Sequence, residues 1–150
     1  MADVKYKLST RAGNPITVLS TELNAMANGG GALSATIDNA ADLDLYMDLE
    51  LTVTFAAPPT ANTLVEAYIV RSVDGTTFED ATAGAAPVVP GNGYAGGFVL
   101  RAVTTAQRLV IPMVQVPPRD FLVQLVNRSG QAFPAVGSVC RALFYKEQVV

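Results

Sequence analysis

Residues 43–55 alternate strictly between apolar and polar side chains. The odd-numbered positions are Leu43, Leu45, Met47, Leu49, Leu51, Val53 and Phe55, and the even-numbered positions between them are acids, threonines and one tyrosine. Successive side chains of a β-strand point to opposite faces, so this period predicts one long strand. We expect Leu49 and Leu51 to be buried, and Asp48 and Glu50 to face solvent or a partner.

The same criterion predicts further strands along the chain. Apolar runs bounded by Gly, Pro, Asn or Asp predict strands at residues 4–9, 32–37, 64–73, 98–104, 108–116, 121–127 and 136–145. A short helix is expected from a cap at Ser20 or Thr21 through Met26. The dipeptide Asp74-Gly75 predicts a tight turn. Residues 81–97 are rich in Gly, Ala and Pro and predict a long, mobile surface loop suited to binding.

About eight strands without alternating helices favour two packed sheets over any α/β arrangement. We therefore predict an all-β fold, a jelly-roll-like antiparallel β-sandwich of about eight strands with one short helix. The 150 residues, half of them apolar, suffice for a single domain over residues 1–150. An extended N-terminal arm is expected at about residues 1–13.

Charge is divided unevenly between the two halves of the chain. The net charge is −3 overall, −7 for residues 1–80 and +4 for residues 81–150. Arg101, Arg108, Arg119 and Arg128 lie in the half with few acids, so we expect some of them to bind carboxylates of a partner. The cations are scattered and do not form a basic stripe, so nucleic acid is not an expected partner.

Catalytic motifs are nearly absent from the sequence. There is no histidine, which removes the usual general base and every histidine-dependent triad. Asp42, Asp44, Asp48 and Glu50 share one face of the predicted strand, which leaves a carboxylate hydrolase open, although a solvated strand face has the same pattern. We expect no catalytic residue and no cofactor.

A calcium site is a further alternative for the acidic segment before the long strand. Asp38, Asn39, Asp42 and Asp44 offer the oxygen ligands that calcium prefers, but their spacing does not match an EF-hand loop. A solvated acidic segment is the simpler interpretation, and we expect no metal.

Two single residues also carry expectations. Cys140 is the only cysteine, so no disulfide forms within the chain, and its apolar neighbours predict a buried thiol. Arg71 falls on the apolar parity of its strand, so either the strand emerges there or Arg71 is paired with an acid; we favour the pair.

The N-terminal segment has two lysines in its first ten residues and no apolar core. We expect neither a secretion signal nor a membrane anchor, and hence a protein that stays in the cytoplasm where it is made. High hydropathy with few charges indicates apolar surface that a partner covers. It also favours self-association, most simply as a two-fold dimer.

The segments LNAMANGGGALSATIDNAADLDLYMDLELTVTF (residues 23–55) and EAYIVRSVDGTTFED (residues 66–80) cover a little over a third of the chain. They resemble the capsid cement, or decoration, proteins that tailed bacteriophages encode beside the major capsid protein. The resemblance implies a dimeric jelly-roll subunit of the virion, assembled in the host cytoplasm. It also implies binding to the outer capsid surface, where the subunit fastens neighbouring major capsid protein subunits and stabilises the head.

Two other functions remain open. A carbohydrate-binding β-sandwich of a phage tail or head is the main alternative, although such modules usually expose aromatic side chains and this chain has no tryptophan. A carboxylate hydrolase ranks last. The resemblance ends at Asp80, so it implies no particular capsid-contact residues. From the charge and loop patterns we expect the four arginines named above and the loop of residues 81–97 to contact the capsid.

Overall fold

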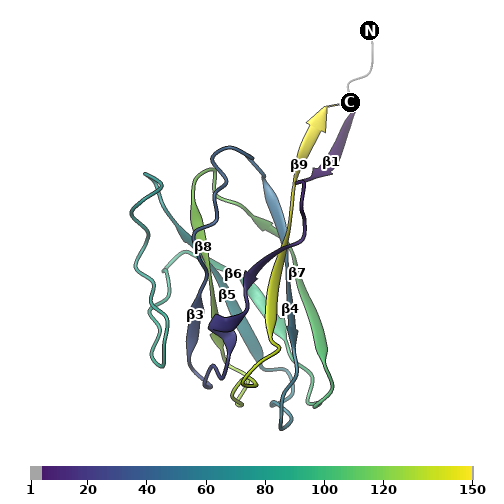
Figure 1. Ribbon diagram of the computed structural model, residues 1–150, viewed down its shortest axis with the longest axis vertical. Helices are drawn as coiled ribbons and strands as arrows, with labels where there is room; N and C mark the ends of the chain where they lie inside the picture. The colour runs from purple at the N-terminus through teal and green to yellow at the C-terminus, as the bar shows by residue number, and fades with distance from the viewer. Residues whose placement is uncertain (1–4, 150) are drawn as a thin grey trace.

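The computed structural model describes residues 5–149 and has two antiparallel sheets packed face to face (Figure 1). Sheet A contains β1 (Tyr6–Thr10), β2 (Ile16–Leu19), β9 (Val139–Val149), β4 (Tyr46–Val53) and β7 (Gln107–Gln115). Sheet B contains β3 (Gly31–Leu33), β8 (Phe121–Asn127), β5 (Leu64–Arg71) and β6 (Tyr94–Val99). Among the described residues the only helical element is the 3-10 turn η1 (Thr21–Leu23).

The strand order is that of a jelly roll. β1 and β2 both pair with β9 and form one interrupted strand, so sheet A runs in the order β1/β2, β9, β4, β7. Sheet B runs in the order β3, β8, β5, β6. In each sheet, strands from the two halves of the chain lie side by side, which is the result of two Greek keys folded together. The predicted fold class is confirmed.

The core lies between the two sheets, and β4 contributes its most regular row. Met47, Leu49, Leu51 and Val53 are fully buried, whereas Asp48 and Glu50 on the other face are partly exposed. The predicted register is therefore confirmed. Aromatic rings complete the core across the sheets; Phe121 and Phe144, for example, have ring centroids 6.3 Å apart.

The long strand is shorter than its sequence pattern predicts. β4 begins at Tyr46, and both Leu43 and Leu45 are exposed rather than buried. Leu43 has φ +52°, in the left-handed region, so the chain turns there and cannot continue as a strand. Phe55 lies beyond the end of β4 and is nevertheless buried.

Other predicted boundaries also shift. The expected helix is only the turn η1, and the Ser20 side chain makes no capping hydrogen bond there. β6 covers residues that were predicted as loop, and the predicted strand 98–104 has left the sheet by residue 100. β8 matches its prediction, and β9 begins and ends later than expected. The turn at Asp74 is confirmed: Gly75 has φ +84°, and hydrogen bonds from residues 76 and 77 lower the Asp74 pKa.

Residues 79–93 form a long surface loop, as predicted, and this segment packs on the outer face of sheet B. Gly84 exchanges two backbone hydrogen bonds of 2.9 Å with Gly31. Gln124 Nε2 donates to the carbonyl oxygens of Thr82 and Val88 at 2.8 and 2.7 Å. Val126 of β8 points away from the core and is nevertheless fully buried, which indicates that this segment covers the outer face of sheet B.

The expected acid partner of the Arg71 side chain is not found among the described residues. Its guanidinium donates instead to the carbonyl oxygen of Asn92 at 3.0 Å, because β5 emerges from the core there. Cys140 is buried as predicted, and burial raises the pKa of its thiol to about 12. Within residues 5–149, no helix is long and apolar enough to cross a membrane.

The register of β4 is testable by paired substitutions. Leu51→Ala removes a fully buried side chain and should lower the free energy of unfolding by roughly 2–5 kcal/mol through lost burial and a residual cavity. Glu50→Ala on the opposite face should cost less than about 1 kcal/mol. Denaturant unfolding of both variants measures the two costs, and equal costs would contradict the register.

Candidate interaction surfaces

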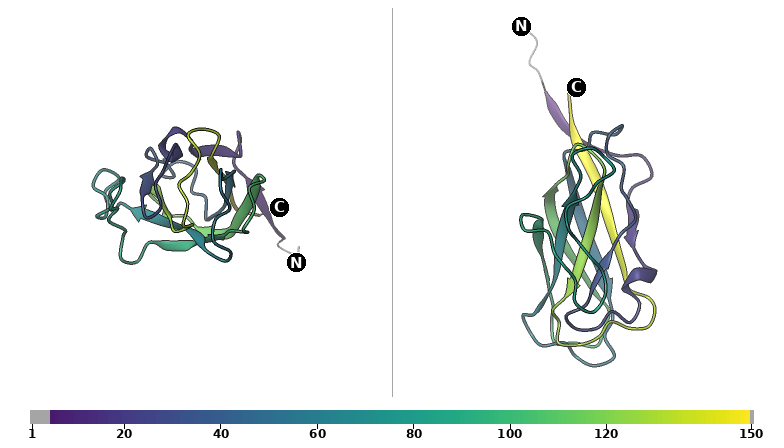
Figure 2. Two further views of the ribbon diagram at one scale, coloured as in Figure 1. Left: turned by 90° about the horizontal axis from the view of Figure 1, so that it is seen from below. Right: turned by 90° about the vertical axis from the view of Figure 1, so that its left-hand side faces the viewer.

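A two-stranded ribbon, formed by residues 6–10 and 145–149, projects beyond the body of the sandwich (Figures 1 and 2). Cross-strand pairing places Tyr6 opposite Val149 on one face, and the side chains of Tyr6, Leu8 and Val149 on that face are exposed. The other face carries polar side chains such as Lys7. Of the predicted arm at residues 1–13, residues 1–4 lie outside the described chain, and most of the rest pairs with β9.

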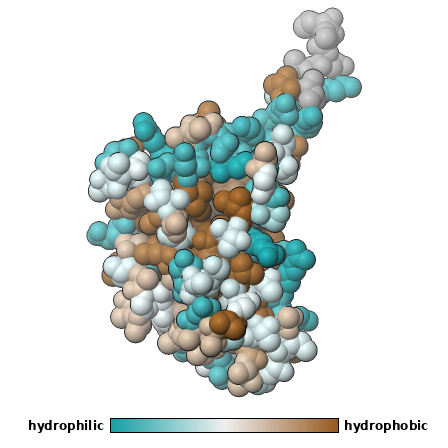
Figure 3. Space-filling view, in the orientation of Figure 1, coloured by the Kyte–Doolittle hydropathy of each residue, from teal (hydrophilic) through white to brown (hydrophobic). Residues whose placement is uncertain are grey.

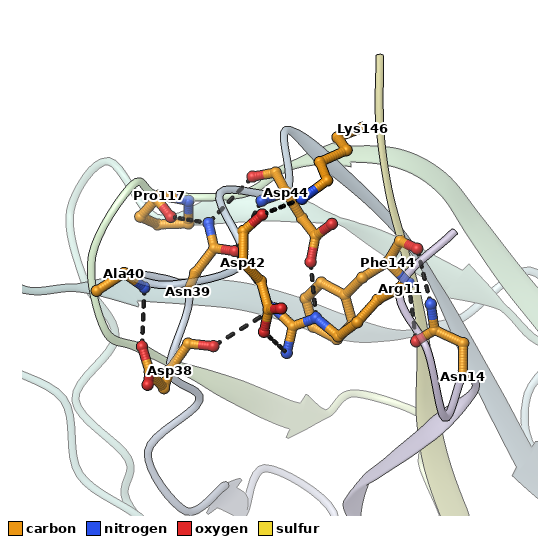
Figure 4. Close-up of polar contacts among 10 residues, drawn as sticks. All are labelled: Arg11, Asn14, Asp38, Asn39, Ala40, Asp42, Asp44, Pro117, Phe144 and Lys146. Carbon is orange, nitrogen blue, oxygen red and sulfur yellow. Dashed lines mark hydrogen bonds and ion pairs between the residues drawn. The ribbon is translucent and has the colours of Figure 1, made fainter. Parts of the chain in front are cut away.

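An arginine clamp fixes the base of this ribbon to the body (Figure 4). Arg11 Nε donates to Asp44 Oδ2 at 2.7 Å, and its Nη1 lies 3.3 Å from Asp42 Oδ2. Arg11 Nη2 donates to Asn39 Oδ1 at 3.3 Å, and the guanidinium lies 4.5 Å from the centroid of the Phe144 ring. Arg11 Nη2 also donates to the Asp38 carbonyl oxygen at 3.4 Å, so the clamp combines two ion pairs, two further hydrogen bonds and a cation–π contact.

Asn39 extends the clamp into the loop between β3 and β4. Its buried amide donates to the carbonyl oxygens of Asp44 and Pro117 at 3.0 and 2.7 Å and accepts the Asp44 N–H at 2.9 Å. Lys146 Nζ in the ribbon donates to the Asp42 carbonyl oxygen at 2.5 Å. Three segments distant in sequence are therefore joined at one point.

The clamp involves the same acidic residues as the calcium hypothesis. The Arg11 guanidinium occupies the position between Asp42 and Asp44 that a cation would take. Among the described residues, no group of three or more His, Cys, Asp or Glu side chains is arranged to hold a metal ion. Asp48 and Glu50 lie on β4 beyond the clamp, so the structure separates the four strand acids into two environments.

At the opposite end of the sandwich, four loops form a surface that we name the loop end. It consists of residues 20–30, 54–63, 100–106 and 128–138, which connect strands at the end away from the ribbon. These loops hold only three charged residues, Glu22, Arg101 and Arg128, and Val136 among them is 73% exposed. Figure 3 shows hydrophilic side chains gathered near the ribbon and mainly pale, less polar ones at the loop end.

Asn127 at the end of β8 holds the loop end together. Its side chain is fully buried and donates to the carbonyl oxygens of Met26, Ala27 and Gln131 at 2.7–3.2 Å. Its Oδ1 accepts the Ser129 N–H at 3.0 Å. Because one buried amide satisfies groups of two loops, their surface is held in one conformation before any partner binds.

Gln107 does the same for the loop before β7. Its side-chain amide is fully buried and forms two hydrogen bonds with the Arg101 backbone, at 2.9 and 3.0 Å. Gln107 and Asn127 could have been noticed in the sequence, since each is an amide in an otherwise largely apolar strand. The sequence pattern does not show which backbone groups these amides hydrogen-bond.

The structure does not bring the four predicted arginines together. Arg101 and Arg128 lie at the loop end, Arg108 lies on the outer face of sheet A, and Arg119 lies at the ribbon end. Two of them already have acids: Arg108 Nε is 2.5 Å from Glu50 Oε2, and Arg128 Nε is 3.1 Å from Glu66 Oε2. Arg108 and Arg128 therefore pair with acids of the first half of the chain, which the count of acids within the second half does not predict.

The outer face of sheet A contains a shallow hollow that the sequence pattern does not predict. Its volume is about 250 Å³, and it is lined by Pro15, Asp48, Glu50, Arg108, Val110, Arg141 and Leu143. The lining combines both signs of charge with apolar side chains from β4, β7 and β9.

No protein-family model and no curated protein matches the chain.

The Arg11 clamp gives a stability prediction. Arg11→Ala leaves the buried Asp44 carboxylate without its ion pair, so the free energy of unfolding should fall by roughly 3–5 kcal/mol. Arg119→Ala, an exposed arginine at the same end, is the matched control and should cost less than about 0.5 kcal/mol. Denaturant unfolding measures both, and equal losses would show that the clamp does not stabilise the fold.

Proposed function

We propose that this chain is a virion structural protein that binds the outer capsid surface and cements neighbouring major capsid protein subunits, stabilising the head. One observation carries the proposal: the loop end is a broad, weakly charged surface whose conformation is already held by buried amides. Such a surface suits a broad contact with other protein subunits better than the binding of one small ligand. The resemblance of residues 23–55 and 66–80 to capsid cement proteins supports the same function.

The loop end is the surface that we assign to the shell. The loop end carries few charged side chains, so a partner that covers it removes few charges from water. Removing charges from water is the most costly part of burying a polar surface. The conformation of the loop end is already held by Asn127 and Gln107, so binding orders little additional chain. Arg101 is exposed at this end and can pair with a carboxylate of the shell, and the exposed Arg128 can do so by exchanging its partner Glu66 for one.

Many copies acting together make such a surface effective. Each contact can be weak, because a shell offers the same site many times and each copy that bridges two subunits gains from both attachments. A cement protein of this kind acts by binding alone, in keeping with a chain that contains no histidine.

A carbohydrate-binding function is the second candidate, and one observation favours it. Tyr94 on the outer face of sheet B is 58% exposed, and its ring lies 5.5 Å from that of Tyr68. Glu66 Oε2 accepts hydrogen bonds from the Tyr68 hydroxyl and from Arg128 Nε, both at 3.1 Å. An exposed aromatic ring beside a carboxylate and an arginine can bind a sugar through stacking and hydrogen bonds.

The cement function is tested with capsids assembled without this protein. The double variant Arg101→Ala/Arg128→Ala should reduce the amount of protein that sediments with such capsids several-fold, and the difference should shrink as salt is raised. Arg119→Ala, at the other end, is the control and should bind like the parent. Both should unfold at nearly the parent temperature, because exposed ion pairs contribute about 1 kcal/mol or less. If the parent does not bind the capsids, the proposed function is wrong.

Glycan binding is tested separately on a glycan array. If the second candidate is correct, the parent should bind specific glycans and Tyr94→Ala should lose roughly tenfold or more in affinity, the loss expected on removing a stacking ring. Tyr6→Ala, an exposed tyrosine of the ribbon, is the matched control. Absence of glycan binding by the parent would reject this candidate and leave the capsid assay unaffected.

A further inference from the structure

The outer face of sheet A is an exposed surface with regular rows of side chains across its strands. One row holds Arg141 of β9, Glu50 of β4 and Val110 of β7, and Val110 is 53% exposed. The next row toward the ribbon holds Leu143 and Asp48. The ribbon continues the same face, because Leu8 lies opposite Glu147 on the parity of Leu143 and Arg141.

This face is large enough to bind a protein. β9, the adjacent β4 and β7 beyond it have 11, 8 and 9 residues, and together they define roughly 30 Å by 15 Å, about 450 Å² before side-chain relief is counted. That is the same order as the ~800 Å² that each partner contributes to a stable interface of standard size. Exposed apolar side chains lie along it from Val110 and Met113 to Leu8 in the ribbon.

The charged side chains on this face are only partly paired within the chain. Glu50 binds Arg108 through Oε2. Within residues 5–149, no carboxylate oxygen lies within 4.0 Å of the exposed Arg141 guanidinium. The hollow described above lies directly between these groups. Arg141 therefore faces outward beside an acid that its own chain has already paired.

These groups are complementary to a second copy of the same face. A two-fold axis parallel to the strands, midway between β4 and β9, places β4 of one copy over β9 of the other. Because Glu50 and Arg141 are register partners, each Arg141 then lies over Glu50 of the other copy, twice in one interface. Tyr46 and Tyr145 are register partners as well and lie over each other in the same way.

The alternative two-fold axis, perpendicular to the strands, does not give this complementarity. It would stack β4 on β4 in opposite directions and bring Asp48 close to Glu50 of the second copy. Like charges in contact disfavour association, so the charge pattern selects the parallel arrangement.

We propose that two copies of this chain associate through the outer face of sheet A, about a two-fold axis parallel to the strands, with reciprocal pairs between Arg141 and Glu50. Both loop ends then point in one direction and both ribbons in the other. The ribbons continue the same face beyond the body, so the exposed side chains of Tyr6 and Leu8 lie on the side of each copy that carries the interface. The proposal stands on this face alone and is tested without capsids, so it can fail independently of the proposed function.

The interface is tested by sedimentation velocity over a concentration series. The parent should form dimers, and Val110→Asp and Arg141→Glu should each raise the dimer dissociation constant at least about tenfold. Val73→Asp, an exposed valine in the loop after β5, is the matched control and should dimerise like the parent. A parent that stays monomeric, or one that forms trimers, would overturn the proposal. Dimers unaffected by both substitutions would also overturn it.

The orientation is tested by cross-linking. Leu8→Cys places a reactive thiol on the ribbon, while the native Cys140 is buried and does not compete. In the parallel arrangement the two ribbons leave at the same end, on either side of the axis, so a bifunctional maleimide with a long spacer should join the Leu8→Cys copies. Val73→Cys, on the side of sheet B, should not cross-link. Dimers in which Leu8→Cys fails to cross-link would overturn the parallel axis.

Discussion

The alternation of side chains along β4 is the constraint on which the rest of the structure depends. β4 lies between β9 and β7 in sheet A, so both of its edges are hydrogen-bonded and only its two faces remain for packing. Its inner row is fully buried against sheet B, and its outer row presents Asp48 and Glu50. A shift of one residue would exchange the two rows, which would bury the acids and expose the core. The same register therefore determines both the core and the outer face that we assign to a second copy.

The two ends of the sandwich differ in how they are stabilised. The ribbon end is stabilised by charge, with Arg11 between Asp42 and Asp44, and the loop end by buried amides, with Asn127 and Gln107 satisfying backbone groups. A buried amide carries no charge and leaves the surface above it apolar or weakly polar. This difference explains how one end can be suited to a broad contact with a shell while the other keeps most of the charge.

The proposed surfaces agree with one another geometrically. A parallel two-fold dimer through sheet A leaves both loop ends free on the same side, so that both can contact a shell at once. Two attachments in one rigid particle bind more strongly than either alone, without any additional contact. The cover formed by residues 79–93 lies on sheet B, away from this dimer face, and does not obstruct it.

The sequence alone determined the all-β class, the register of β4, the buried thiol of Cys140 and the tight turn at Asp74. Each of these depends on neighbours in sequence: side-chain alternation, local apolar composition or a single dipeptide. The sequence could not show that Leu43 and Leu45 leave the strand, because their parity matches the core row and only the turn in the folded chain exposes them. Nor could it show that Arg11 neutralises acids about thirty residues away, or that Arg108 and Arg128 bind Glu50 and Glu66 from other strands. Charge counted along the chain predicted free arginines in the second half, whereas the jelly roll places strands of the two halves side by side and pairs their charges. Contacts between such distant segments are decided by strand order, and strand order is a property of the tertiary structure.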